Sequence, residues 1–150
     1  MSIDSLYRQI IMDHYKDPRN KGLKNDENYR TINLVNPSCG DDVTVQLLIE
    51  NGMIKDVRHT GTGCSICCSS ASVMSEELKG ENVDVALEKI DAFNLLLTGK
   101  DFNDEILKGE ALAYMGVSKF PARIRCANLA WHAAKEGILK EKEENNGWKY

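Results

Sequence analysis

The sequence lacks three features that would each point to a particular kind of partner. It has no block of basic residues and carries a net charge of −4, which argues against nucleic acid as the main ligand, because phosphate contacts need clustered Lys and Arg. It has no apolar run near the roughly 20 residues of a membrane span. Residues 1–5 show no basic start leading into an apolar stretch, the pattern of a signal peptide. We therefore expect a cytoplasmic protein that binds neither nucleic acid nor membranes.

The chain also lacks internal repeats and any linker that would divide it. Its 150 residues are the usual size of one domain, and a chain of this length buries roughly 68–70% of its unfolded surface. The hydrophobic content of 42% and the charged content of 28% are ordinary for a globular protein. We expect a single domain over residues 1–150, in which the charged and polar segment 140–150 forms a flexible tail.

Alternating residues predict a small sheet in the first half of the chain. Val43, Val45 and Leu47 alternate with polar residues, as in a half-buried strand. Asn51-Gly52 follows, which is the strongest short signal for a hairpin turn. We expect strands at 30–35, 43–50 and 53–60, and a mostly antiparallel sheet.

Helical spacing dominates the remaining sequence. Apolar residues recur at intervals of three and four, and Pro121 suits the first turn of the last helix. We expect helices at 4–16, 64–78, 83–97 and 120–138, with a short one near 104–108. One helix, then strands, then several helices is the order of an α+β fold, here a small three-stranded mostly antiparallel sheet packed against several helices.

Five cysteines are an odd number, and in a reducing compartment thiols that bind metal or do chemistry are favoured over disulfides. Cys39 lies between two expected strands, two residues before Asp41. Gly40 can adopt backbone angles denied to other residues, which would let the thiol and the carboxylate point the same way. Asn-Pro and Gly-Asp are also common turn formers, so the motif alone is equally compatible with a simple turn. Asp42 competes with Asp41 for a ligand role.

Two further cysteines lie near helix starts. Cys64 follows Gly-Thr-Gly and opens a helix, where unpaired backbone N–H groups and the helix dipole favour a thiolate. Cys126 lies in the first turns of the last helix, with Arg123 three residues before it and Arg125 adjacent. Those arginines could also form a solvated helix start.

The other cysteines and the histidines are weaker candidates. Cys64 and Cys67 match Cys-x-x-Cys, but Cys67 falls on an apolar helical stripe, which favours a buried cysteine over a redox pair. Cys68 could be an auxiliary thiol. The histidines lie in three separate elements without ligand spacing, so we expect core or surface roles for them: His14, His59 and His132.

If the three candidate cysteines and Asp41 converge, they offer three thiolates and one carboxylate. This donor set suits tetrahedral Zn²⁺, and Arg123 or Arg125 would offset the excess negative charge. The same thiolates could hold an iron–sulfur cluster. Spacing alone leaves both possibilities open.

Four motifs together resemble the U-type iron–sulfur cluster assembly proteins, the IscU/NifU N-terminal-like family. They span nearly the whole chain in the family's order: Tyr-Arg-Gln-Ile-Ile-Met-Asp-His-Tyr-Lys-Asp-Pro-Arg-Asn (7–20), Asn-Pro-Ser-Cys-Gly-Asp (36–41), Gly-Cys-Ser-Ile with Ser-Ser-Ala-Ser-Val-Met (within 63–74) and Ser-Lys-Phe-Pro-Ala-Arg-Ile-Arg-Cys-Ala (118–127). Two features resemble the SufU branch. Arg125 stands where the scaffold branch has a histidine, and residues 95–115 resemble an insertion typical of SufU.

The resemblance implies a SufE/IscU-like fold and a zinc-dependent sulfurtransferase that takes persulfide sulfur from a SufS-like cysteine desulfurase and serves downstream iron–sulfur assembly proteins. Matched by position, the zinc ligands would be Cys39, Asp41, Cys64 and Cys126. Cys39 would accept the sulfur, and Arg123 would assist desulfurase docking or transfer. Cys67 and Cys68 depart from the family pattern, where residues without thiols are usual.

Three other functions remain open from the sequence. The first is a scaffold that assembles a transient [2Fe–2S] cluster, or holds iron, on the same ligands. The second is a thiol oxidoreductase that uses Cys64 and Cys67, and the third is a structural zinc domain.

Overall fold

The computed structural model describes residues 2–107 and 109–145, and it contains a three-stranded antiparallel sheet in the order β1-β2-β3. The strands are β1 (Arg30–Asn36), β2 (Asp41–Glu50) and β3 (Met53–Thr62). Val43, Val45 and Leu47 of β2 are fully buried, as the alternation predicted. At the β2–β3 turn Asn51 and Gly52 have φ of 52° and 75°, the left-handed pair that a tight hairpin requires.

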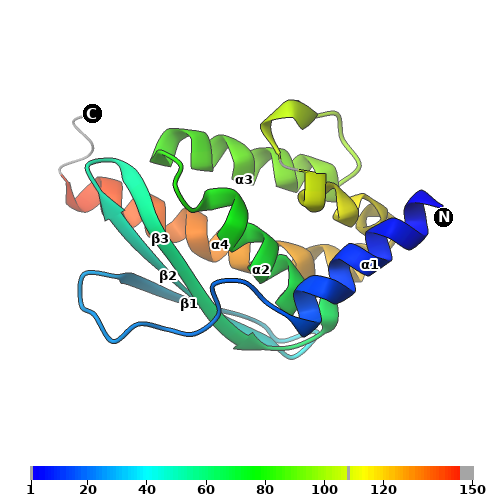
Figure 1. Ribbon diagram of the computed structural model, residues 1–150, viewed down its shortest axis with the longest axis horizontal. Helices are drawn as coiled ribbons and strands as arrows, with labels where there is room; N and C mark the ends of the chain where they lie inside the picture. Colours follow the sequence, from blue (N-terminus) through cyan, green and yellow to red (C-terminus); the bar gives the residue numbers. More distant parts are fainter. Residues whose placement is uncertain (1, 108, 146–150) are drawn as a thin grey trace.

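Helices cover one face of this sheet (Figure 1). The predicted α+β class is confirmed. They are α1 (Ile3–Lys16), α2 (Ser65–Leu78), α3 (Val83–Leu97), α4 (Pro121–Glu144) and two 3-10 segments, η1 (Asp104–Ile106) and η2 (Gly109–Lys119). Within the described residues no helix combines the length and apolar character needed to cross a membrane.

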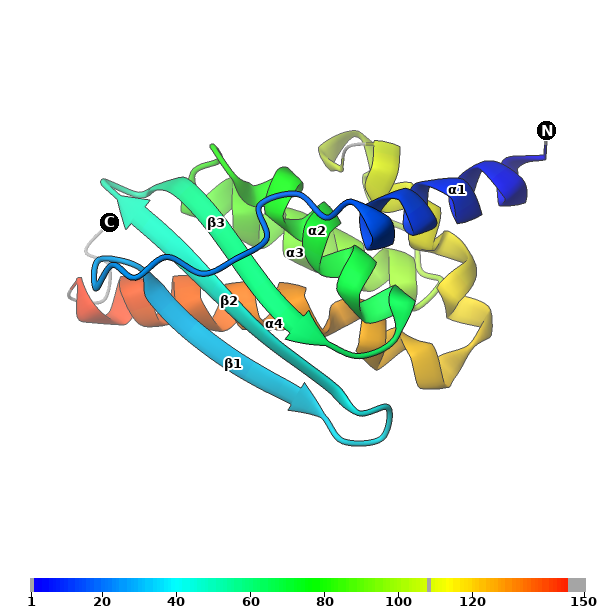
Figure 2. The same ribbon diagram turned by 60° about the horizontal axis from the view of Figure 1, so that its bottom comes forward.

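α4 runs along the face of the sheet, and Figure 2 shows it behind all three strands. Gly137 makes this close packing possible, since a Cβ there would lie only 3.0 Å from Leu47 Cδ1. On its other side α4 buries Trp131, which stacks on Phe93 of α3 with ring centroids 3.9 Å apart. The core therefore lies between the sheet and the helices, and α4 joins its two halves.

Two segments differ from expectation. Residues 109–119, which have no clear helical period, form the 3-10 segment η2. Residues 140–144, which we expected to belong to a flexible tail, instead continue α4 to Glu144, and Arg30 of β1 lies 3.1 Å from Glu141 and 2.7 Å from Glu144. Residues 108 and 146–150 lie outside the described residues, so a flexible end of the chain stays a prediction.

Candidate metal centre

The turn between β1 and β2 carries Cys39. Two backbone hydrogen bonds close the turn, from Cys39 N–H to Asn36 O (3.2 Å) and from Gly40 N–H to Pro37 O (3.3 Å). Gly40 has a φ of 69°, a left-handed value that favours glycine. Cys39 is half-buried at the end of the sheet, where its position on a turn lets its side chain move without disturbing a strand or helix.

Asp41 and Asp42 begin β2 and point to opposite faces, because side chains alternate along a strand. Asp41 is buried on the side of Cys39, with 2% exposure. Asp42 is exposed and accepts a hydrogen bond from Asn33 Nδ2 at 2.7 Å. The alternation therefore places Asp41, and not Asp42, beside the thiols.

Cys64 is the N-cap residue of α2, as its position after Gly-Thr-Gly predicted. Its backbone N–H donates to Asp41 Oδ1 at 3.1 Å, so the carboxylate occupies the positive end of this helix. Gly63 has a φ of 148°, and a Cβ there would overlap the Asp41 carboxylate. Glycine at 63 is thus needed both for the backbone angle and for the approach of Asp41.

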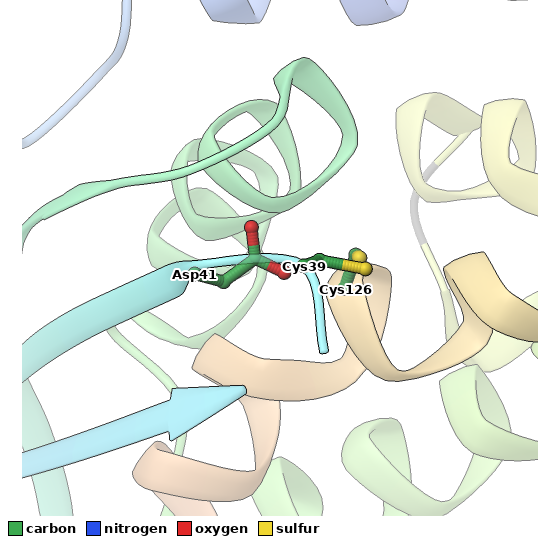
Figure 3. Close-up of side chains that lie close together, drawn as sticks. All are labelled: Cys39, Asp41 and Cys126. Carbon is green, nitrogen blue, oxygen red and sulfur yellow. The ribbon is translucent and has the colours of Figure 1, made fainter. Parts of the chain in front are cut away.

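Cys126 comes from the second turn of α4 and completes a three-residue group. One ligand atom each of Cys39, Asp41 and Cys126 lies within 4.8 Å of the others, and Figure 3 shows the three side chains pointing toward one another. Cys39 Sγ and Cys126 Sγ both approach the carbonyl oxygen of Ala122, at 3.8 Å and 3.9 Å. Cys64 is not part of this group, but its side chain interacts with that of Cys126.

The group fits a small tetrahedral cation. Zn–S bonds of about 2.3 Å would place two sulfur atoms about 3.8 Å apart, so the observed spread needs little contraction. The β1–β2 turn and the start of β2 supply one thiol and the carboxylate, and α4, more than eighty residues later, supplies the second thiol. The Cys64 thiol is the adjacent fourth donor. The residues present thus suit zinc bound by sulfur and oxygen.

The electrostatics of the site favour a bound cation. Burial, followed by hydrogen bonds with Asp41, Cys39 and Cys64, raises the pKa of the Cys126 thiol, because a buried thiolate beside other anions is unfavourable. A cation among these donors reverses this effect. The exposed Arg123 interacts with the Cys126 side chain, which raises the pKa of the guanidinium. Arg125 is also exposed and lines a different hollow, with Asn128 and His132.

Asn36 is part of the site, although its sequence signal indicated only a turn. It ends β1 opposite Asp41 and is 3% exposed. Its Nδ2 donates to Asp41 Oδ2 (3.3 Å) and to Cys126 Sγ (3.7 Å), while its buried Oδ1 has no hydrogen-bond partner among the described residues. One amide thus orients two candidate ligands. The only sequence signal that could have indicated Asn36 is its position directly before the Cys39 turn.

The two other cysteines and the three histidines lie outside the cysteine group, as the sequence favoured. Cys67 is fully buried, and burial raises the pKa of its thiol, which does not suit a redox pair with Cys64. Cys68 is half-buried, and burial raises the pKa of its thiol too. His14 is hydrogen-bonded with Ser72 and Glu110, His59 with Arg19 O, and His132 Nε2 accepts from Asn128 Nδ2.

Known proteins match this chain over almost its whole length. The NifU-like N terminal domain family matches residues 6–146. The zinc-dependent sulfurtransferase SufU of Bacillus subtilis is 43% identical over 144 residues, which are 96% of this chain and 97% of the relative. The iron–sulfur cluster assembly scaffold protein IscU of Streptococcus pyogenes is 34% identical over 138 residues, 92% of this chain and 86% of the relative.

Solved structures agree with these matches. A crystal structure from Fervidobacterium islandicum, described as an iron–sulfur cluster assembly scaffold of the SUF system, superposes with a TM-score of 0.79 at 30% identity and covers 91% of this chain and 99% of that one. A NifU-like N-terminal protein from Brucella abortus has the same TM-score at 22% identity, which speaks for the fold alone.

Proposed function

Because the chain belongs to the NifU-like N-terminal domain family, we propose that it is a zinc-dependent sulfurtransferase in iron–sulfur cluster assembly. In this proposal Cys39 accepts persulfide sulfur from a cysteine desulfurase, and the sulfur then passes to downstream assembly proteins. The main support is the convergence of Cys39, Asp41 and Cys126, with Cys64 beside them, in a chain 43% identical to a relative of that name.

Zinc would be held by Cys39, Asp41, Cys64 and Cys126. When bound, it keeps its thiol ligands deprotonated at neutral pH and contributes no redox chemistry of its own. The Cys64 N–H and Asn36 Nδ2 hold the Asp41 carboxylate in place. Of these four ligands, Cys39 alone lies on a turn. Cys39 is therefore the ligand whose release disturbs the fold least.

The transfer step is a thiol–persulfide exchange. The Cys39 thiolate attacks the terminal sulfur of the desulfurase persulfide, and a new S–S bond forms at Cys39 Sγ. The S–S bond on the desulfurase breaks, and its cysteine leaves as a thiolate, so no net oxidation occurs. The exposed guanidinium of Arg123, close to the Cys126 side of the group, is placed to attract the anionic persulfide.

A scaffold for a [2Fe–2S] cluster is the second candidate, and the 34% identity to a protein named IscU scaffold favours it. It would use the same thiolates to bind iron and sulfide. Arg125, which stands where the scaffold branch has a histidine, favours the sulfurtransferase instead.

Sulfur acceptance can be tested directly. The protein is incubated with a cysteine desulfurase and cysteine, persulfides are alkylated, and peptides are identified by mass spectrometry. We expect a persulfide on Cys39 and none in Cys39→Ser, while Cys68→Ser, a matched loss of one thiol outside the group, still accepts sulfur. A Cys39→Ser chain that stimulates the desulfurase normally would refute the acceptor role. Metal analysis with a visible spectrum separates colourless zinc protein from a brown iron–sulfur scaffold.

A further inference from the structure

A second group of possible metal ligands lies away from the cysteines, where α1, α2 and η2 meet. His14 comes from α1, Glu76 from α2 and Glu110 from η2, and one ligand atom of each lies within 4.8 Å of the other two. Both α2 and η2 pack against α1 (Figure 1). The group shares no residue with the proposed zinc ligands, and its donors are nitrogen and oxygen only.

The His14 ring is held in one orientation by its surroundings. Its side chain is fully buried, Nδ1 lies 2.7 Å from Ser72 Oγ, and Nε2 lies 3.0 Å from Glu110 Oε2. Ser72 Oγ also accepts the backbone N–H of Arg19 at 2.8 Å, which fixes the hydroxyl. An oxygen partner on one ring nitrogen, with the other facing carboxylates, is the usual setting of a metal-bound histidine.

The distances suit a cation with oxygen and nitrogen ligands. Bonds of about 2.1 Å in an octahedral site place neighbouring ligand atoms about 3 Å apart, close to the 3.0 Å between His14 Nε2 and Glu110 Oε2. Without an ion, a proton on His14 Nε2 can form a hydrogen bond with Glu110 Oε2. A divalent ion would replace this proton, and Nδ1–H would then donate to Ser72.

The third donor and the open side distinguish this group from a plain His–Glu pair. A cavity of about 430 Å³ adjoins His14, Glu76 and Glu110 and has room for water ligands. The glutamate side chains are 43% and 47% exposed, so an ion can enter from solvent and meet the buried ring at the base.

Two nearby cations among the described residues have carboxylate partners outside the group. Lys79, which lines the same cavity, lies 3.2 Å from Asp56. Arg19 lies 2.6 Å from Asp13 and 3.9 Å from Glu76. Two carboxylates and a neutral imidazole would balance the charge of a divalent ion.

We propose that His14, Glu76 and Glu110 form a second divalent-cation site, for an ion of the Mn²⁺ or Fe²⁺ class that prefers carboxylate and imidazole to thiolate. The ion would join α1, α2 and η2. It would bind independently of the cysteine group, so the proposal stands or falls separately from the proposed sulfur transfer.

Manganese is the suitable probe, because it binds thiolates poorly and leaves zinc in the cysteine group. Protein containing one equivalent of zinc is titrated with MnCl₂, and free Mn²⁺ is measured by its electron paramagnetic resonance signal. We expect one Mn²⁺ bound per chain. Glu76→Gln should weaken binding by at least about tenfold, the scale of effects around metal ligands.

Glu76→Gln keeps the His14–Glu110 contact, so loss of the fold does not confuse the result. Glu88→Gln, which removes the same charge from an exposed position, should bind Mn²⁺ like the wild type. Mn²⁺ should raise the melting temperature of the wild type and of Glu88→Gln but not that of Glu76→Gln. Absence of binding at millimolar Mn²⁺, or equal binding by Glu76→Gln, would overturn the proposal. Zinc content and persulfide formation should be unchanged in Glu76→Gln.

Discussion

Replacing Asn36 by alanine tests whether a residue outside the proposed ligand set controls metal affinity. The side chain is buried and donates through one amide group to Asp41 Oδ2 at 3.3 Å and to Cys126 Sγ at 3.7 Å. In the Asn36→Ala chain both acceptors lose this donor. Asp41 then keeps the Cys64 N–H on its other oxygen, so the carboxylate is held at one point instead of two.

The size of the effect follows from the hydrogen bonds. A hydrogen bond to a charged group contributes about 1.5–3 kcal/mol, and the long distances here place the pair near the lower end, about 1.5 kcal/mol. This corresponds to about a tenfold loss of zinc affinity. The unpartnered Asn36 Oδ1 adds no loss, because its removal breaks no hydrogen bond among the described residues.

The assay is competition for zinc against a chromophoric chelator at fixed pH and salt. Asn33→Ala is the matched control, since Asn33 lies on the same strand but donates to the exposed Asp42. We expect Asn33→Ala to bind zinc as the wild type does. Equal zinc affinities for Asn36→Ala and Asn33→Ala would show that the amide does not orient the ligands, and the reasoning would be wrong.

Three further predictions concern the same region and the stability of the fold. Gly63→Ala should lower both zinc affinity and melting temperature, because its Cβ would overlap the Asp41 carboxylate; chelator competition and thermal denaturation measure the two effects, and an unchanged affinity would contradict the required close approach. Asp41→Asn should weaken zinc binding by at least about tenfold, whereas Asp42→Asn should not, and the reverse order would assign the ligand to Asp42. The hydrogen bond to Asp56 raises the pKa of Tyr29 to about 12, above its ordinary value of about 10, so the folded state favours the neutral phenol. This contribution to stability is complete below about pH 10 and is lost as the pH rises to about 12; denaturant titrations across that range should show a smaller loss for Tyr29→Phe than for the wild type.

Several features of this protein follow from short stretches of sequence. The alternation of Val43, Val45 and Leu47 and the Asn51-Gly52 turn predicted the β2–β3 hairpin, because strand period and turn geometry are local properties of the backbone. The start of α2 at Cys64 was predicted in the same way.

Other features were beyond such patterns. Residues 109–119 have no clear period, and their 3-10 conformation depends on packing against α1, α3 and α4. The continuation of α4 through a polar segment to Glu144 brings Glu141 and Glu144 into contact with Arg30, which lies more than a hundred residues earlier in the chain. Sequence patterns do not identify contacts of this kind, since the separation of two residues along the chain says nothing about their distance in space.

The candidate metal centre likewise has features that local sequence predicts and features that only the tertiary structure sets. The sequence by itself predicted which thiols could bind a metal, because a turn and a helix start are local settings that expose or stabilise a thiolate. Only the tertiary structure decided that Asp41 faces the thiols while Asp42 faces away, that Asn36 joins Asp41 to Cys126, and that Glu76 approaches His14. These contacts arise because α4 packs on the sheet and α1 packs on α2, and the packing of whole elements is set by the entire core rather than by any one motif.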